Sequence, residues 1–385
     1  MTSANTKDRL NLITRNTQEV LTESDLSSLF SSGTELRHYI GFEISGKVHL
    51  GTGLISMGKV ADFLKAGVKC TLLLADFHSY LNNKLGGSWE NIRKASEGYF
   101  KSGLIASLLC FGVDVEKEVK AGNLTFVMGK DLYENNIVHW ETFMEVGKHI
   151  TLSRNLRSIS IMGKKQGAEV DMATLFYPPL QVADIFTLGV NIAHAGIDQR
   201  KAHVIARSVA KKLKINPLKD KNGQIIAPVA IHHNLIAGLD APSKNDLGKN
   251  TTDAIESLKM SKSKPNSAIF VHDSIDDIKG KISKAYCPPV EIEFNSMINW
   301  VKFLVFWGEE AGEFVVERKK EFGGTAVYRQ FSDFEKDYRL AKLHPVDLKN
   351  AVASWLIAKL EPARNYFFKT ENARSLEFMD KVLNG

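Results

Sequence analysis

Short apolar runs alternate with amphipathic segments along the first part of the chain. Runs of strand length, rich in apolar and β-branched residues, occupy residues 36–42, 68–75, 124–128, 191–196 and 225–231. Helical periodicity follows the first run over residues 53–65, and it returns over residues 89–110. This order predicts an α/β fold with a doubly wound parallel sheet, because crossover helices connect parallel strands.

Other stretches depart from this alternation. Residues 130–188 are mostly helical in pattern and predict an insertion between two halves of the sheet. Residues 240–266 are polar and rich in lysine, serine, asparagine and glycine, which is typical of a mobile surface loop. We therefore predict an N-terminal helical arm over 1–34, a Rossmann-like domain over 35–270, and an all-helical C-terminal domain over 271–385.

Composition adds little to this picture. The chain has 385 residues, 44% of them hydrophobic and 24% charged, as in ordinary globular proteins, and its net charge of +6 only leans towards a polyanionic partner. No apolar run is long enough to cross a bilayer, and residues 1–24 lack the apolar core of a secretory signal. The three cysteines have no metal-binding spacing and are odd in number, which predicts a reduced, cytoplasmic protein.

The stretch from His38 to Gly53 has the pattern of a strand, a glycine-rich turn and the start of a helix. Such a turn aims unpaired N–H groups at its contents, and the helix dipole adds a preference for an anion such as phosphate. Gly41 would let a nucleotide approach the backbone, Ser45 offers a hydroxyl, and His49 adds a donor that titrates near neutral pH. The stretch predicts a phosphate-binding turn.

A second motif lies in the polar loop, where residues 258–264 read Leu-Lys-Met-Ser-Lys-Ser-Lys. Ammonium groups interleaved with small hydroxyl residues can close over a triphosphate and neutralise charge as pyrophosphate leaves. A solvated basic loop is the simpler interpretation of a lysine and serine run, but the full string over 259–263 is far more specific than such a run.

Together, the His-x-Gly turn at 49–51 and the string at 259–263 resemble the two signatures of class I aminoacyl-tRNA synthetases. Over residues 10 to 365, further motifs are similar, in their order, to the tyrosyl-tRNA synthetases of the archaeal and eukaryotic type. These motifs are Tyr39–Glu43, Leu74–Asp76, Tyr177-Pro178 with Gln181 and Asp184, Asp198–Lys201, and Leu343–Pro345. One position departs from the family: the second histidine of the first signature is Thr52, which can donate to a phosphate oxygen but carries no charge.

The resemblance implies a two-step reaction with ATP and Mg²⁺ as the substrate complex and no tightly bound metal. Tyrosine and ATP would give tyrosyl-adenylate and pyrophosphate, and tRNA(Tyr) would then take the tyrosyl group. The implied catalytic residues are His49, Thr52, Lys259 and Lys262. The implied ATP-binding residues are Gly41, Ser45, His49, Gly51, Asp198, Met260, Ser261 and Ser263. Asp198 would accept from the ribose, although capping of the following helix is an alternative role.

For tyrosine, the resemblance implies that Tyr39 and Asp184 meet the phenolic hydroxyl, which can donate to a carboxylate and accept from a phenol. Phenylalanine would leave the carboxylate buried and unpaired, which is unfavourable. The other implied tyrosine-binding residues are Tyr177, Gln181 and Gln199 near the α-amino group, and His78 in the lining. Tyr177, Gln181 and Asp184 fall at i, i+4 and i+7, so one helical face can present all three. Routine helix packing remains the alternative for Tyr177 and Gln181.

The implied tRNA-binding residues are Arg154, Arg157, Arg200, Lys201, Phe322, His344 and Asp347. The first four would hold the acceptor end, Phe322 could stack on an anticodon base, and Asp347 could accept from a guanine edge. A helix start at His344 is the alternative for that segment. The family further implies a homodimer formed through the insertion, with no membrane association.

Three other functions are compatible with parts of this sequence. Tryptophanyl-tRNA synthetase shares the fold and both signatures, and the Tyr39 and Asp184 pair is the feature that favours tyrosine over it. A small-molecule nucleotidyltransferase could carry a similar His-x-Gly turn, but it would not explain the helical C-terminal region or the lysine string. A non-catalytic, synthetase-like tRNA-binding protein is conceivable because of Thr52.

Overall fold

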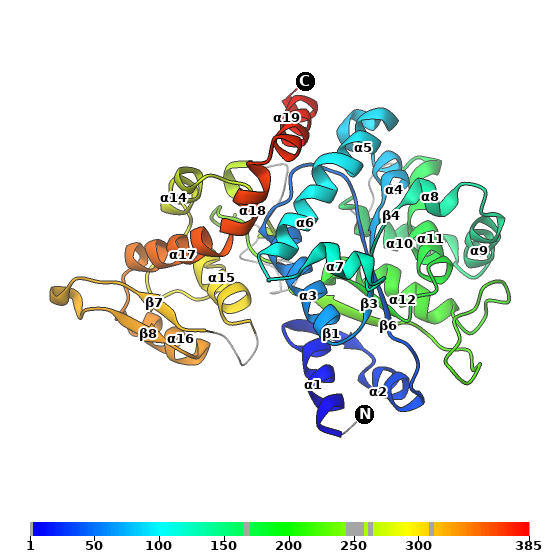
Figure 1. The fold of residues 1–385 in the computed structure, drawn as a ribbon, viewed down its shortest axis with the longest axis horizontal. Coiled ribbons are helices and arrows are strands. Elements are labelled where there is room, and N and C mark those ends of the chain that lie inside the picture. Colours follow the sequence, from blue (N-terminus) through cyan, green and yellow to red (C-terminus); the bar gives the residue numbers. More distant parts are fainter. Residues whose placement is uncertain (1–2, 165–169, 244–257, 261–264, 308–311, 385) are drawn as a thin grey trace.

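A six-stranded sheet forms the centre of the protein (Figure 1). The computed structural model describes residues 3–164, 170–243, 258–260, 265–307 and 312–384. Its strands are β1 Thr17–Leu21, β2 Arg37–Phe42, β3 Lys69–Leu74, β4 Leu124–Met128, β5 Ile192–Gly196 and β6 Val229–His233. Across the sheet they follow the order β1-β6-β5-β2-β3-β4. Strands β2 to β6 run parallel, and the chain changes direction across the sheet between β2 and β5. This arrangement confirms the doubly wound α/β prediction.

The parallel strands are buried because helices cover both faces of the sheet (Figure 1). Every residue of β5 and β6 is buried, as expected for central parallel strands. Buried polar exceptions include His38, His194 and His233: the His194 imidazole contacts both His38 and His233, across β2, β5 and β6. The sheet core therefore contains a row of histidines within otherwise apolar packing.

The N-terminal arm differs from the prediction of a purely helical segment. Helices α1 Ser3–Thr14 and α2 Glu23–Ser32 flank strand β1, which pairs antiparallel with β6 at the sheet edge. Strand β1 was not predicted, because this five-residue segment, TQEVL, is polar in its first half and only half-buried. An edge strand with one solvent-facing side lacks the continuous apolar run that marks a central strand.

The predicted helices after the early strands are present. The π-helical turn η1 Gly51–Ser56 leads into α3 Met57–Lys65, and the long helical segment consists of α5 Trp89–Ala95, η3 Ser96–Phe100 and α6 Lys101–Leu109. Shorter helices complete this part, with bounds α4 Asp76–Leu81, η2 Lys84–Gly87 and α7 Val115–Lys120. Gly53 is required in η1, because a Cβ there would lie 2.3 Å from the Val271 side chain.

The predicted helical insertion is also present between β4 and β5. Its elements are α8 Gly129–Tyr133, α9 Ile137–Lys148, α10 Leu152–Ser158, η4 Ile159–Met162 and α11 Met172–Thr187. After β5, the short turn η5 Ile197–Gln199 leads into α12 Arg200–Val209. Most of the polar range 240–266 lies outside the described residues, so its predicted mobility stays a prediction.

The C-terminal region is mainly helical, but it is not all-helical as predicted. Its helices are α14 Ile275–Ser283, α15 Ser296–Trp300, η7 Val301–Val305, η8 Lys320–Phe322, α16 Phe331–Arg339, α17 Pro345–Lys359, α18 Glu361–Phe367 and α19 Thr370–Asn384. Strands β7 Phe314–Val316 and β8 Ala326–Tyr328 form an antiparallel hairpin among them. Three residues per strand are too few for a period-two pattern, so the sequence did not reveal this hairpin.

The C-terminal helices return to the part of the chain that contains the sheet. In Figure 1, α18 and α19 lie beside α6 and α5, and Lys47 forms an ion pair with Asp380 of α19. The chain end therefore packs near the turn that follows β2. Across the described ranges, no helix combines the length and the apolar character needed to span a bilayer.

Candidate active site

The candidate residues lie at the carboxyl ends of the parallel strands. The turn with His49 follows β2, His78 follows β3 in α4, and Asp198 follows β5 in η5. In open α/β sheets this edge, at the point where the strand order reverses, is where ligands bind. The reversal between β2 and β5 brings together segments that are far apart in the sequence.

The turn after β2 is held in a fixed conformation. The Gly51 N–H donates to His49 Nδ1 over 3.0 Å, and the Leu50 N–H donates to the Ile269 carbonyl over 3.0 Å. A Cβ on Gly51 would lie 2.9 Å from the His49 ring, so a larger residue there would displace this imidazole. Thr52 follows Gly51 in the first turn of η1, and it is half-buried.

The second signature contacts the same edge of the sheet. Residues 258–260 are fixed by backbone bonds from the Gly238 N–H to Leu258 O (2.7 Å) and from the Met260 N–H to Ile236 O (2.9 Å). Ile236 also lies against Gly51, since a Cβ on that glycine would be 3.7 Å from its side chain. The two signatures, distant in sequence, are thus separated by one side chain. Lys262, Ser261 and Ser263 lie outside the described residues.

Lys259 donates to Asp198 Oδ2 over 2.6 Å. Asp198 does not cap α12, the alternative role considered for it: Gln199 is the capping residue and makes no side-chain cap bond. A carboxylate that follows β5 and an ammonium that follows β6 therefore form an ion pair at the sheet edge. Both side chains are partly exposed, at 39% for Lys259 and 20% for Asp198, so a ligand can reach them.

Asp184 is fully buried on α11, and its two carboxylate oxygens have different surroundings. Oδ1 accepts from the Tyr133 hydroxyl over 2.8 Å. Oδ2 has no hydrogen-bond partner among the described residues, and His78 Nε2 lies 3.7 Å from it, which is too far for a hydrogen bond. Burial raises the pKa of the Tyr39 hydroxyl, on β2, and the nearby charge of Asp184 raises it further. The two predicted residues, Tyr39 and Asp184, are therefore near enough to interact electrostatically.

Burial controls the protonation of this group of side chains. It raises the pKa of Asp184 to about 8, against the opposing effect of the Tyr133 hydrogen bond. It also lowers the pKa of His78 to about 3, so this imidazole is neutral at physiological pH. A neutral histidine and a carboxyl group with one unbonded oxygen form a site suited to a neutral hydroxyl group.

The other predicted tyrosine-binding residues lie beside this pair. Tyr177, Gln181 and Asp184 share one face of α11, as their spacing predicts. Gln181 Nε2 donates to Gln199 Oε1 over 3.4 Å, which joins α11 to the segment after β5. The Tyr177 ring meets His78 edge-on at 4.7 Å between ring centroids. The predicted tyrosine-binding residues of α4, α11 and η5 therefore lie next to one another.

Sequence reasoning assigned no role to two residues of this site, Tyr133 and Glu43. Glu43 Oε1 accepts from the Tyr177 hydroxyl over 2.8 Å and from Asn82 Nδ2 over 2.7 Å. Glu43 lies in the quoted motif 39–43, so its position after β2 was available as a signal. Tyr133 lies at the end of a short helix with no motif around it, and nothing in its local sequence indicates the contact with Asp184.

The basic residues predicted for the tRNA acceptor end gather at the surface between α10 and α12. Lys201 Nζ donates to the Arg157 carbonyl over 3.1 Å, and Arg154 donates to the Val204 carbonyl over 3.3 Å. Arg200 instead forms a bidentate pair with Glu19 of β1. Three of the four residues thus share one surface, whereas Arg200 is tied to the N-terminal arm.

The residues predicted for the anticodon lie on neighbouring loops of the C-terminal region. Phe322 in η8 is 64% exposed. Arg318 donates to the carbonyls of Gly324 and Lys342, which ties this loop to the segment before α17. His344 caps α17 by accepting from the Val346 N–H over 3.2 Å, and Asp347 lies in the first turn. The helix-start role considered for His344 is therefore present.

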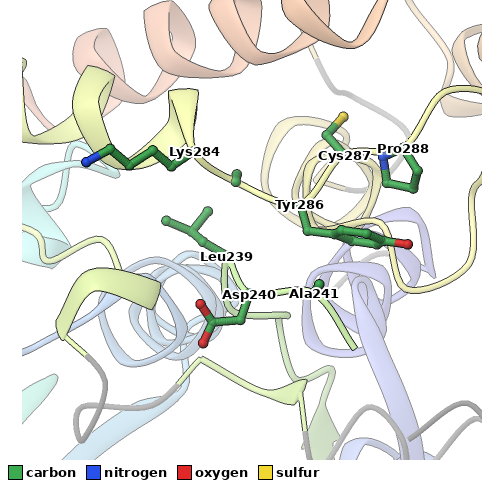
Figure 2. Close-up of a pocket in the computed structure, with 8 residues that line it drawn as sticks. Leu239, Asp240, Ala241, Lys284, Tyr286, Cys287 and Pro288 are labelled. Atoms are coloured by element: carbon green, nitrogen blue, oxygen red, sulfur yellow. The ribbon is translucent and has the colours of Figure 1, made fainter. Parts of the chain in front are cut away.

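A separate pocket of about 450 Å³ lies between the segment after β6 and residues 284–288 (Figure 2). Its lining residues are Leu239, Asp240, Ala241, Lys284, Ala285, Tyr286, Cys287 and Pro288. The Tyr286 N–H donates to the Leu239 carbonyl over 2.8 Å, so the pocket lies where the segment after β6 meets the C-terminal region. None of the predicted site residues that the structure describes lines it.

Within the described ranges, no group of three or more His, Cys, Asp or Glu side chains is arranged to hold a metal ion.

Comparisons with known proteins agree with this geometry. The family of class I tRNA synthetases (W and Y) matches residues 31–361. The tyrosine–tRNA ligase of Thermococcus sibiricus is 47% identical over 377 residues, which is 97% of this chain and 98% of that protein. The crystal structure of tyrosyl-tRNA synthetase complexed with L-tyrosine from Pyrococcus horikoshii superposes with a TM-score of 0.92 at 46% identity, over 97% of this chain and 99% of that one. A tryptophanyl-tRNA synthetase from Aeropyrum pernix, at 16% identity and a TM-score of 0.62 over 93% of this chain and 84% of that one, shares the fold alone.

Proposed function

The chain belongs to the class I tRNA synthetases of the tyrosine and tryptophan family, and we propose that it activates L-tyrosine with ATP and attaches it to tRNA(Tyr). The observation that carries the choice of amino acid is the buried Asp184 carboxylate beside Tyr39, with one oxygen available to accept from a substrate hydroxyl. Phenylalanine would leave that oxygen buried and unpaired. The indole ring of tryptophan has a different shape, and its N–H would lie at a different position from the phenol hydroxyl. The tryptophan alternative is not favoured, because the relatives at high identity are tyrosine–tRNA ligases.

In the first step, the tyrosine carboxylate attacks the α-phosphorus of ATP, which is bound as its Mg²⁺ complex, and pyrophosphate leaves. No protein nucleophile takes part, so this chain contributes positioning and stabilisation of the developing negative charge. His49 and Thr52 would donate to the phosphate oxygens at the turn after β2. Lys259 and Lys262 would neutralise the leaving pyrophosphate.

The ion pair of Lys259 with Asp198 supports a partner exchange during ATP binding. The ribose hydroxyls of ATP would donate to the Asp198 carboxylate, which releases the ammonium of Lys259 towards the phosphates. Gly41, which is exposed after the buried part of β2, would allow close approach of the nucleotide to the backbone. The further nucleotide contacts that we propose are Ser45, Gly51, Met260, Ser261 and Ser263.

In the second step, a terminal hydroxyl of tRNA attacks the tyrosyl carbonyl, and AMP leaves. The surface formed by Arg154, Arg157 and Lys201 lies between α10 and α12 and would bind the acceptor end, with Arg200 beside it. Residues 271–385 would form the anticodon-binding domain, where Phe322 would stack on a base and His344 and Asp347 would contact base edges. The N-terminal arm, 1–34, and the catalytic domain, 35–270, complete the proposed organisation.

The insertion has an exposed apolar surface that supports a second copy of the chain as its partner. Its exposed members on α9, α10 and α11 are Ile137, Val138, Met144, Leu152, Leu156, Met172 and Phe176. Large apolar patches on soluble proteins commonly mark an interaction surface. We expect a homodimer through this surface, in the cytoplasm, where the three free, buried cysteines stay reduced.

Tyrosine-dependent exchange of pyrophosphate into ATP tests the proposed function. The expected result is exchange with tyrosine, and an exchange rate with phenylalanine that is lower by a factor of at least roughly 10⁴, because the site hydrogen-bonds the substrate hydroxyl. Discrimination of roughly 10⁴- to 10⁵-fold is general for sites that hydrogen-bond a substrate hydroxyl, and tyrosyl-tRNA synthetase against phenylalanine is the standard example. Exchange driven by tryptophan and not by tyrosine would overturn the choice of amino acid. Binding of tRNA without exchange for any amino acid would instead identify a non-catalytic protein.

A further inference from the structure

We propose that Tyr133 is a positioning residue for recognition of the substrate hydroxyl. Its phenol holds one oxygen of Asp184 and leaves the other oxygen directed to the amino acid. This inference rests on the proposed function, since it concerns how the same site selects tyrosine. Tyr133 does not act on the reacting atoms; it acts through Asp184.

The contact that carries the inference joins two buried groups. The Tyr133 hydroxyl donates to Asp184 Oδ1 over 2.8 Å, and both side chains are at most 2% exposed. The other oxygen, Oδ2, has no hydrogen-bond partner among the described residues. The ionised form of a buried carboxyl group is stabilised by more than one donor, and Oδ2 is free to accept from a bound molecule. The hydroxyl of tyrosine provides such a donor, and the benzyl ring of phenylalanine does not.

The Tyr133 ring is held by its neighbours, which fixes the direction of its hydroxyl. It stacks on His139 at 4.2 Å between centroids and meets Phe77 edge-on at 4.8 Å. Trp140 Nε1 donates to the Tyr133 carbonyl over 3.2 Å, which also anchors the backbone. These contacts come from α4 and α9, so the hydroxyl cannot turn away from Asp184 without disturbing two helices.

The hydroxyl of Tyr133 also favours the ionised form of Asp184. Burial raises the pKa of Asp184, the Tyr133 hydrogen bond lowers it, and the Asp76 carboxylate raises it. Removal of the hydroxyl therefore shifts Asp184 towards the protonated form, which accepts less well from the substrate phenol. The titratable groups that face Asp184 from the elements packed against it are Tyr39 on β2, Asp76 and His78 on α4, Tyr133 on α8 and Tyr177 on α11.

The substitution Tyr133→Phe tests the inference, because it removes the hydroxyl and keeps the stacked ring. In pyrophosphate exchange we expect the KM for tyrosine to rise roughly 10- to 100-fold, the range for a hydrogen bond to a charged group, with kcat nearly unchanged. The preference for tyrosine over phenylalanine should fall by a similar factor. The acid limb of kcat/KM for tyrosine should also move to higher pH, since that limb reports the free enzyme.

A merely structural role would leave the pH limb and the amino-acid preference unchanged. Tyr338→Phe is the matched control: it removes another buried hydroxyl, which donates to the Pro288 carbonyl in the C-terminal region, and should keep the parent values. In the background of Asp184→Asn, Tyr133→Phe should cause little further loss of preference, because the two residues act together. Thermal unfolding of each variant checks the fold.

The outcomes separate this inference from the proposed function. If the parent protein shows no tyrosine-dependent exchange, the proposed function fails. If the parent is active and folded Tyr133→Phe keeps the parent KM, preference and pH limb, the function stands and the inference about Tyr133 is overturned.

Discussion

Lys259 Nζ lies 2.6 Å from Asp198 Oδ2, although 61 residues separate them in the sequence. The pair joins the lysine segment after β6 to the turn after β5, at the edge of the sheet where the two signatures meet. Each side chain therefore has a partner that an incoming nucleotide can replace. This relationship makes the role of the lysine directly testable.

Substitution Lys259→Ala should slow adenylate formation far more than it weakens tyrosine binding. The lysine is proposed to act on the phosphates and not on the amino acid, and loss of one charge-stabilising group typically lowers kcat by roughly 10²- to 10³-fold. Single-turnover formation of tyrosyl-adenylate, with tyrosine affinity measured by calorimetry, checks this split. Lys219→Ala, an exposed lysine on another surface, is the control; equal rates in parent and Lys259→Ala would refute the role.

Substitution Tyr39→Phe should raise the KM for tyrosine by roughly 10-fold, because a buried neutral hydrogen bond to the substrate hydroxyl is lost. The KM for ATP should stay at its parent value. Steady-state pyrophosphate exchange gives both constants. Tyr328→Phe, in the C-terminal hairpin, provides the control, and an unchanged tyrosine KM in Tyr39→Phe would remove Tyr39 from the recognition site.

Substitution Thr52→His should increase the rate of adenylate formation by roughly 5-fold, since a charged donor makes a stronger hydrogen bond to phosphate than a hydroxyl does. Thr52→Val, which keeps the shape and removes the donor, should lower the rate. Rapid-quench measurements at saturating tyrosine and ATP compare the two. A rate that responds to neither change would show that position 52 takes no part in the first step.

The buried histidines of the sheet should make the fold sensitive to acid. His38 Nε2 lies 3.1 Å from His194 Nδ1, and His194 Nε2 lies 2.8 Å from His233 Nδ1. Burial lowers the pKa of His38 to about 3 and of His233 to about 4, and it lowers the pKa of His194 well below its usual value.

Because these folded pKa values lie below the unfolded value of about 6.5, the unfolded chain binds more protons in acid. The stability is fully present above pH 6.5 and is lost as the pH falls towards 4, by up to about 1.4 kcal/mol per pH unit for each histidine. Urea unfolding at pH 8, 6 and 5 measures this slope. His344→Gln, at an exposed position, should leave it unchanged, whereas a flat stability between pH 6.5 and 5 would contradict the prediction.

Substitution Phe176→Glu should dissociate the proposed homodimer, because it places a charge in the exposed apolar surface of the insertion. Sedimentation velocity at micromolar concentration should show a smaller species than in the parent. Phe368→Glu changes a residue that is 81% exposed and lies outside the insertion, and it should keep the parent oligomeric state. If the parent itself sediments as a monomer, the proposed dimer is wrong.

Much of the fold could be predicted because its signals are local. Central strands such as β3 and β5 are mostly apolar runs of strand length, and the spacing of Tyr177, Gln181 and Asp184 puts them on one helical face whatever surrounds the helix. The edge strand β1 was missed because it is partly polar, and the hairpin β7–β8 was missed because three residues per strand are too few to show a periodicity.

The sequence by itself determined the α/β class, the two signature segments and the residue types that suit phosphate and phenol recognition. Only the tertiary structure decided which of these residues meet. Tyr133 reaches Asp184 across 51 residues, and Lys259 reaches Asp198 across 61. Such pairs depend on the strand order and on how helices pack over the sheet, and local periodicity carries no information about either. The selectivity of the site therefore depends on contacts that form only when distant segments reach the same edge of the sheet.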